Sequence, residues 1–301
     1  MAEAIVNGLL SGGLYAIIAL GLSLVFGVMG LVNLAHGDIM IVGAYLASLL
    51  IGALHIDPLL SLVIVVPIVM LLAYPLQRFV LTGLLRRGLE PPLVATFGVS
   101  LLISAALAEL FGGNARSLAA PYASSGFGLA GVSVPTIGAI TLVIAIVLVV
   151  ATHLTVSRTQ FGAALRAASA DPTTAATMGI DVQRVYAITF AAAAGFAAVA
   201  GVLIGVGYSF GPTTGTGYLL IGFTVVVLGG TTGVLGSLWG GLAVGLIQSV
   251  GSTVLGGQYR DLVVYVAFLV ILLLAPTASR LRHSLPRRRS GARLNTVPVT
   301  R

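Results

Sequence analysis

The chain has 301 residues, of which 58% are hydrophobic and only 8% are charged. Soluble domains carry about 25% charged residues, so this composition excludes a soluble fold and predicts a chain that crosses a lipid bilayer several times. The absence of cysteine also excludes disulfides, thiolate catalysis and sulfur-ligated metal sites.

The basic residues are all arginines, and seven of them lie between Arg280 and the end of the chain. Arginine beside a hydrophobic span is typical of a cytoplasmic flank, so the net charge of +7 does not indicate nucleic-acid binding. No basic region precedes the first apolar run. We therefore expect that run to be retained as a span rather than removed as a signal peptide.

The first apolar stretch, from Ala4 to Leu54, is too long for one span. As a single helix it would measure about 75 Å, whereas the hydrocarbon core of a bilayer is about 30 Å thick. We expect two helices, at about 5–29 and 38–54, with Asp38 as a possible N-cap of the second. The break between them contains the polar residues Asn33, His36 and Asp38.

Five further spans follow at similar intervals. They are expected at about 59–80, 92–111, 136–156, 185–208 and 261–278. The segment 112–135, rich in glycine, serine and alanine, is interpreted as an external loop. Of the 39 glycines, most are interpreted as positions that let helices approach closely in lipid.

The stretch 218–256 contains two apolar runs separated by the glycine-rich sequence Gly229–Gly236. Either two short helices cross the bilayer here, which gives nine spans, or one part enters and returns, which gives seven crossings and a hairpin. The arginines at 78–87, 158–184 and 280–301 place those segments in the cytoplasm, and hence the C-terminus inside and the N-terminus outside.

The fold class is therefore all-α: a polytopic membrane bundle of about eight to nine transmembrane helices with a polar cytoplasmic helix. We expect a single transmembrane domain over residues 1–279 and a basic, disordered cytoplasmic tail over 280–301.

The longest polar interruption, residues 158–184, contains three arginines and two aspartates. Within it, Asp171 is a favourable N-cap, Pro172 stands at the first helical position, and Gly179 is a left-handed stop. The helix between them, from Pro172 to Met178, would be about two turns or roughly 10 Å long. A capped helix this short and polar is predicted to lie at the surface and to be held by another protein.

Several longer motifs carry a resemblance to a known family. They are the run from Gly12 to Leu22, Asn33-Leu-Ala-His36-Gly37-Asp38, Gly43-Ala-Tyr45, Gly179-Ile-Asp-Val182, Phe190–Gly201 and Leu228–Gly236. With these motifs the chain resembles the permeases of bacterial branched-chain amino-acid ABC importers, and in particular the first of the two paired permeases. It departs from that pattern at Ala275-Pro276-Thr277-Ala278, where such proteins often have an Arg-Pro-x-Gly-like ending.

The resemblance implies a subunit of the cell inner membrane rather than a complete machine. Its partners would be a second permease, identical or different, two cytoplasmic ATPases and an extracytoplasmic solute-binding protein. This chain has no lysine and therefore no Gly-x-x-x-x-Gly-Lys-[Ser/Thr] phosphate loop. We expect it to be no enzyme and to bind no cofactor, while ATP and magnesium are used by the partner ATPases.

The interruption 158–184 is the first candidate site. It is expected to dock in a groove of an ATPase subunit and to transmit the closing of the ATPase dimer to the adjacent spans. The candidate coupling residues are Arg166, Asp171, Pro172, Met178, Gly179 and Asp181. The alternative is a solvated loop whose arginines only obey the topology rule.

Two polar breaks are candidates for the translocation path or gate. Asn33, His36 and Asp38 either line the path or cap the second span, with His36 paired to Asp38. In the other break, hydroxyls and exposed backbone either face the path or close a tightly packed turn; its residues are Gly229, Gly230, Thr231 and Thr232. His36 has no second histidine at ligand spacing, so we expect no metal site.

The function implied is inward movement of a branched-chain or related amino acid by alternating access. One alternative is a permease for another small polar solute, such as urea or short amides. A second is a self-sufficient secondary transporter, which the scarcity of acidic residues within the spans disfavours. An intramembrane enzyme is disfavoured because the sequence has no convergent nucleophile and base.

Overall fold

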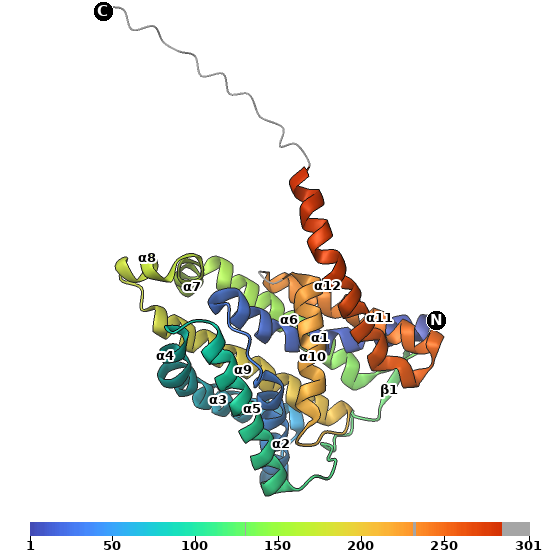
Figure 1. The fold of residues 1–301 in the computed structure, drawn as a ribbon. Coiled ribbons are helices and arrows are strands. Elements are labelled where there is room, and N and C mark those ends of the chain that lie inside the picture. Colours follow the sequence, from blue (N-terminus) through green and yellow to red (C-terminus); the bar gives the residue numbers. More distant parts are fainter. Residues whose placement is uncertain (130, 231–232, 285–301) are drawn as a thin grey trace, which may run out of the picture.

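The computed structural model describes residues 1–129, 131–230 and 233–284, and these are almost entirely helical (Figure 1). The only strands among them form an antiparallel hairpin, β1 (Gly126–Leu129) and β2 (Val132–Pro135). The helices are α1 (Ala2–Met29), α2 (His36–Leu54), α3 (Pro58–Pro75), η1 (Leu76–Leu81), α4 (Thr82–Leu85), α5 (Glu90–Phe111), α6 (Thr136–Arg158), α7 (Gln160–Ala170), α8 (Pro172–Thr177), α9 (Val182–Gly207), α10 (Thr214–Gly229), α11 (Val234–Leu255), η2 (Gly257–Tyr259) and α12 (Arg260–Ser284).

The all-α fold class predicted for the chain is confirmed. Seven helical segments of the described residues are long and apolar enough to cross a membrane: α1, α2, the run from α3 to α4, α5, α6, α9 and α11. The stretch 218–256 contains two separate helices, of which α10 has 16 residues and α11 has 22. At about 1.5 Å per residue, α10 is roughly 24 Å long, slightly short of a full crossing. Helix α12 continues to Ser284, and residues 285–301 of the expected tail lie outside the described residues.

The break between the first two spans is confirmed, and glycine geometry explains it. Gly30 adopts the left-handed conformation, with φ of 65°, and its N–H donates to the Phe26 carbonyl oxygen at 2.8 Å. Helix α2 then begins at His36, after Ala35. The expectation that Asp38 caps α2 is wrong, because the helix starts two residues earlier and the Asp38 side chain bonds elsewhere.

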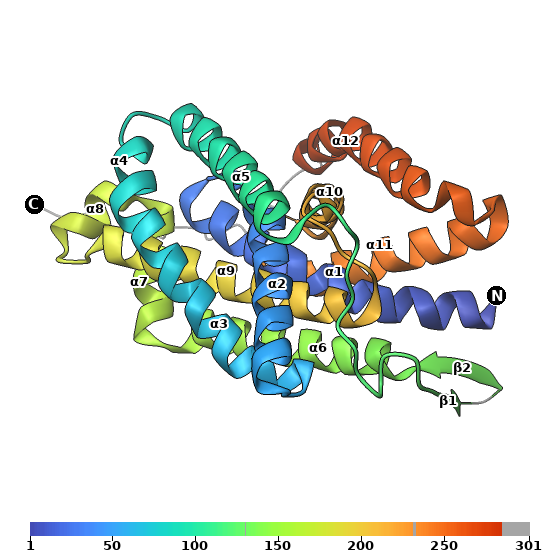
Figure 2. The same ribbon diagram turned by 90° about the horizontal axis from the view of Figure 1, so that it is seen from below.

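Helices α1 and α9 form the buried centre of the bundle (Figure 2). These two helices pack against each other. Helices α11, α6 and α10 pack around α1, whereas α2 and α3 cover α9. Helices α3, α5 and α6 turn large apolar side chains outward; Leu71, Leu102 and Leu110 are each more than 70% exposed. Such an outer surface suits a chain whose surrounding medium is lipid.

Helix contacts at the centre are made between backbones. A Cβ atom at Gly12 would lie 2.7 Å from the Cα atom of Leu242, and one at Gly241 would lie 2.6 Å from the amide nitrogen of Ala16. Between α9 and α2 the approach is closer still, because a Cβ atom at Gly201 would lie 1.8 Å from the Met40 carbonyl oxygen. The packing role predicted for these glycines is thus confirmed.

Replacing Gly201 by alanine should therefore push α9 away from α2. We expect the Gly201→Ala variant to lose about 1–3 kcal/mol of stability, the usual range for overpacking a close contact. The measurement is the thermal unfolding midpoint of the purified chain in detergent. Gly52→Ala in α2 is the matched control, since a Cβ atom there meets nothing within 4 Å. Equal midpoints for the two variants would contradict this account.

Candidate functional site

The polar interruption 158–184 folds into two short helices, α7 and α8, at one end of the molecule (Figure 1). Helix α8 was predicted and is confirmed, although it ends one residue earlier, at Thr177. Helix α7 was not predicted. The sequence does indicate α7, because small and apolar residues recur there every three positions and are buried in the structure: Gly162, Leu165 and Ala168.

Both ends of α8 are closed as the sequence predicts. The Asp171 carboxylate accepts hydrogen bonds from the backbone N–H groups of Thr173, at 2.9 Å, and Thr174, at 3.1 Å. A further bond from the Thr174 hydroxyl, at 2.5 Å, is the main reason that the pKa of Asp171 lies below its usual value. The Asp171 side chain thus supplies the N-cap of α8.

The C-terminal end of α8 forms a Schellman motif. Gly179 is left-handed, with φ of 86°, and its N–H donates to the Ala176 carbonyl at 3.1 Å. The N–H of Ile180 donates to the Ala175 carbonyl, also at 3.1 Å. A short helix fixed at both ends behaves as a stiff element rather than as a frayed loop.

Helix α8 projects from the bundle, and most of its surface is exposed (Figure 1). Only Ala175 of its residues is buried, and the Met178 side chain just beyond it is 79% exposed. A cavity of about 620 Å³ lies beneath it, between Pro172 and Ala176 on one side and Arg86 and Leu89 on the other. An exposed methionine beside an apolar hollow is suited to contact with another protein.

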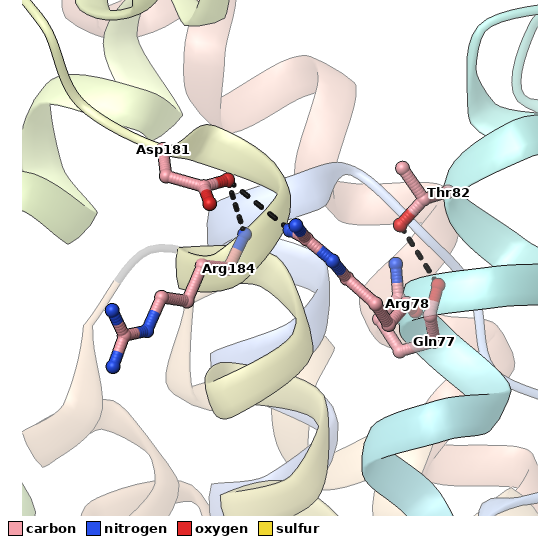
Figure 3. A network of polar contacts seen from close by, with 5 residues as sticks. All are labelled: Gln77, Arg78, Thr82, Asp181 and Arg184. Atoms are coloured by element: carbon pink, nitrogen blue, oxygen red, sulfur yellow. Dashed lines mark hydrogen bonds and ion pairs between the residues drawn. The ribbon is translucent and has the colours of Figure 1, made fainter.

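An ion pair connects the end of this loop to the third span (Figure 3). Asp181 caps α9 by accepting from the Arg184 backbone N–H at 2.9 Å, and it also accepts from Arg78 Nη1 at 3.1 Å. Both bonds hold the pKa of Asp181 below its usual value, and the bond from the Arg184 backbone has the larger effect. Asp181 was expected at the rim of a docking surface. The structure instead places its half-exposed carboxylate in this link between α9 and η1.

The segment η1 that carries Arg78 is a π-helix directly after Pro75. Its Gln77 side chain is fully buried, and within the described residues neither polar atom of the amide has a hydrogen-bond partner. The backbone carbonyl oxygen of Gln77 accepts a hydrogen bond from the Thr82 hydroxyl at 2.8 Å (Figure 3). Single π-helical turns are frequent at functional sites, and neither Gln77 nor Arg78 was found by sequence reasoning.

Arg166 faces its own chain. Its guanidinium Nη1 donates to the Val156 carbonyl at the end of α6, so the side chain fastens α7 onto α6. The residue remains exposed to solvent. Of the predicted coupling residues, Asp171, Pro172, Met178 and Gly179 therefore belong to α8 and its caps. Arg166 and Asp181 belong to the joints on either side.

The residues of the first break are all buried, and each has a contact with the protein, although within the described residues the Nδ1 atom of His36 has no hydrogen-bond partner. Asn33 Oδ1 accepts from the Ala35 N–H at 3.1 Å, and His36 Nε2 lies 3.1 Å from the carbonyl oxygen of Ile18, near the middle of α1. The expected pairing of His36 with Asp38 is wrong. Residues two apart on a helix point about 200° apart, so the two side chains face different neighbours.

Asp38 is instead held by α5. Its carboxylate accepts from the Ser104 hydroxyl at 3.0 Å and from the Ser100 hydroxyl. The two serines stand one turn apart on an otherwise apolar helix, and this spacing was the signal that sequence reasoning missed. They fix α2 to α5, two helices that otherwise have mainly apolar surfaces.

The second break is shaped by close packing. A Cβ atom at Gly229 would lie 2.0 Å from the Gly236 carbonyl oxygen, and Gly230 has a positive φ of 89°. Packing and the turn account for both glycines. Thr231 and Thr232 lie outside the described residues.

Removing both serine donors should leave the Asp38 carboxylate buried without a partner. We expect the double variant Ser100→Ala/Ser104→Ala to lower the free energy of unfolding by about 1–3 kcal/mol, the usual cost of an unsatisfied buried acceptor. Thermal unfolding in detergent measures this loss, with Ser117→Ala, at an exposed position of the loop after α5, as the control. An unchanged midpoint would show that the contact between α5 and Asp38 adds nothing to stability.

Comparison with known proteins places the chain in a family. The model of the branched-chain amino acid transport system permease component matches residues 4–273. The high-affinity branched-chain amino acid transport system permease protein BraD of Pseudomonas aeruginosa is 31% identical, covering 91% of this chain and 94% of that protein. The corresponding protein LivH of Escherichia coli K12 is 30% identical, over 90% and 92%.

A probable branched-chain amino acid transport permease protein, LivH of Methanocaldococcus jannaschii, is 28% identical over 90% of this chain and 89% of its own. No solved structure matches the chain. The matched region extends from the start of α1 into α12 and so includes both polar breaks and the α7–α8 loop. This chain belongs to the family of permease components of branched-chain amino acid transport systems.

Proposed function

We propose that this chain is the membrane permease subunit of an ABC importer that moves branched-chain or related amino acids inward by alternating access. The observation that carries the proposal is the match to BraD and LivH, which are permease proteins of high-affinity branched-chain amino acid transport systems, over about nine-tenths of each chain. The helices long enough to cross a membrane support the same role.

The partners follow from what this chain lacks. It has no lysine and thus no phosphate loop. Because its family serves ABC transport systems, ATP hydrolysis with magnesium is assigned to two separate ATPase subunits. A second permease, a different chain or another copy, completes the pathway, and an extracytoplasmic binding protein delivers the solute. The arginine distribution supports a place in the bacterial inner membrane with the N-terminus outside and the C-terminus in the cytoplasm.

The α7–α8 loop is proposed to receive the mechanical input. Helix α8 is stiff because Asp171 and Gly179 close its ends, and it docks with its exposed Met178 in a groove of an ATPase subunit. The chain leaves α8 directly into α9, and the Asp181–Arg78 pair joins the start of α9 to η1. Movement of α8 would therefore displace α9 and the third span together.

The two polar breaks are proposed to lie at the gate and beside the translocation path. The hydrogen bonds of Asn33, His36 and Asp38 support a structural role at a gate rather than contact with the solute. The second break, with Gly229, Gly230, Thr231 and Thr232, is proposed to lie beside the path, where Gly229 and Gly236 are in tight contact.

ATP-driven uptake tests the function directly. The complete assembly, reconstituted in proteoliposomes with its binding protein, should accumulate L-leucine only when ATP reaches the ATPase subunits, because this chain cannot hydrolyse it. The control is the same assembly with the phosphate-loop lysine of the ATPase replaced. Accumulation by this chain alone without nucleotide would establish a secondary transporter instead. Uptake of urea or short amides but no leucine would contradict the proposed cargo.

Coupling through α8 can be separated from folding. Replacing residues 171–178 by a flexible glycine-serine segment should abolish ATP-driven leucine uptake while the assembly still inserts, because a flexible segment transmits no displacement. The measurements are uptake and the stimulation of ATPase activity by the loaded binding protein. Asp171→Asn is the matched control, since asparagine caps a helix about as well as aspartate, and it should transport normally. Normal uptake in the replaced segment would disprove the coupling role.

A further inference from the structure

A polar cluster joins α1, α11 and the start of α12, away from the sites described above. The Tyr15 hydroxyl donates to Gln248 Oε1, and Gln248 Nε2 donates to Asp261 Oδ1 at 3.3 Å. Arg260 Nη2 lies 3.5 Å from the Tyr15 hydroxyl, and its guanidinium carbon is 5.8 Å from the ring centroid of Tyr208. Tyr15 and Gln248 are each only 2% exposed, so the cluster reaches into the interior of the bundle.

The charges of this cluster are adjacent and opposite, yet neither is neutralised by another side chain. The only ion pair within the described residues joins Arg78 to Asp181, at the far side of the chain. Arg260 is half-buried, whereas Asp261 is exposed and, within the described residues, accepts a hydrogen bond from the Gln248 amide alone. A charged group that is partly buried in a membrane bundle, as Arg260 is, is costly and marks a ligand or ion pathway. A ligand that carries one negative and one positive group would satisfy both residues at once.

The space around the two charges is suited to such a ligand. Arg260 and Gln248 stand between two cavities, and both residues line each of them. The larger, of about 370 Å³, has an apolar wall that includes Leu10, Leu14 and Leu203, and its volume lies in the range of small-molecule sites. The smaller, of about 280 Å³, is lined by Asp261 with Tyr218 and Tyr265.

We propose that this cluster binds a zwitterionic α-amino acid with an aliphatic side chain. Arg260 takes the α-carboxylate, Asp261 takes the α-ammonium group, and the side chain occupies the apolar part of the larger cavity. Arginine suits the carboxylate because its planar fork matches the two oxygens. The inference rests on the proposed function and deepens it, since it assigns a binding site for the cargo to this chain itself.

The position of the cluster agrees with this role. The N-terminus and the start of α12 lie at the end of the molecule opposite α8 (Figure 1). If α8 faces the cytoplasm, the cluster opens toward the side from which a binding protein delivers its solute. Tyr15 lies near the middle of α1, so the site extends from that mouth into the bundle.

Ligand discrimination by the wild-type protein is the first test. The detergent-solubilised assembly without its binding protein is titrated with L-leucine, with leucinamide, which lacks the carboxylate, and with 4-methylpentanoate, which lacks the ammonium group. Saturation-transfer NMR measures each affinity. We expect leucine to bind about tenfold more tightly than either analogue, the effect of losing one charge-assisted hydrogen bond. Equal binding of the three compounds, or no binding, would overturn the proposal.

Variants then assign the two groups. Arg260→Gln should remove the preference for leucine over leucinamide, and Asp261→Asn should remove the preference for leucine over 4-methylpentanoate. Arg260→Lys should restore part of the first preference. Arg87→Gln, at an exposed arginine remote from the cluster, is the control and should keep both preferences. A purely structural role would weaken all three ligands alike. Unaltered or uniformly weakened binding in the two variants would therefore reject the assignment.

The failure of this site is distinguishable from failure of the proposed function. ATP-driven leucine uptake by an assembly that does not discriminate the three compounds would leave the function standing and remove the site. Discrimination without any ATP-driven uptake would keep the site and refute the importer role.

Discussion

Direct contact between helix backbones at glycine is the constraint on which the rest of this structure depends. In lipid, apolar side chains gain little by leaving their surroundings, so helices associate through close packing and hydrogen bonds instead. Gly201 lies against the Met40 carbonyl, and Gly37 and Gly215 bring the starts of α2 and α10 so close that no Cβ atom fits on either. A Cβ atom at Gly21 of α1 would likewise lie 2.9 Å from the Ala193 carbonyl oxygen of α9. Together these contacts fix α1, α2, α9 and α10 as one unit, and polar groups can then be buried at defined positions within it.

The polar groups form two systems at opposite ends of this unit. At one end, α8 and the Asp181–Arg78 pair are exposed and built from local caps, which suits a surface that another protein grips. At the other, Tyr15, Gln248 and Arg260 reach inward between helices. Helix α9 is common to both: its first residues follow α8, while Leu203 lines the cavity beside Arg260. One buried helix thus connects the surface proposed for the energy source with the site proposed for the cargo.

Local signals in the sequence were sufficient to predict most of the spans, the break before α2 and the caps of α8. Each depends on residues within a few positions of one another, as with Asp171 and the amides of Thr173 and Thr174. The links of Asp38 to α5 and of Asp181 to η1 were missed because their partners are 62 to 103 residues away. Opposite charge alone also led to a wrong pairing. His36 and Asp38 are two residues apart in the sequence, but both lie on α2, whose geometry points their side chains in different directions.

An importer must release what it binds, and the arrangement of the proposed cargo site supplies a physical route. The walls of its larger cavity come mainly from α1, α6, α9, α11 and α12, so no single rigid element holds the ligand. Arg260 and Asp261 are carried by α12, whereas Leu203 and Tyr208 are carried by or directly follow α9. Displacement of α9 by α8 would separate Leu203 from the two charges, while Leu10 and Leu14 stay with α1. The ligand would then keep its charged contacts but lose part of its apolar ones, and binding strong enough to capture the solute would become weak enough to let it leave. On this proposal, coupling of α8 to α9 would accomplish more than opening a gate, because it would change the affinity of the proposed cargo site.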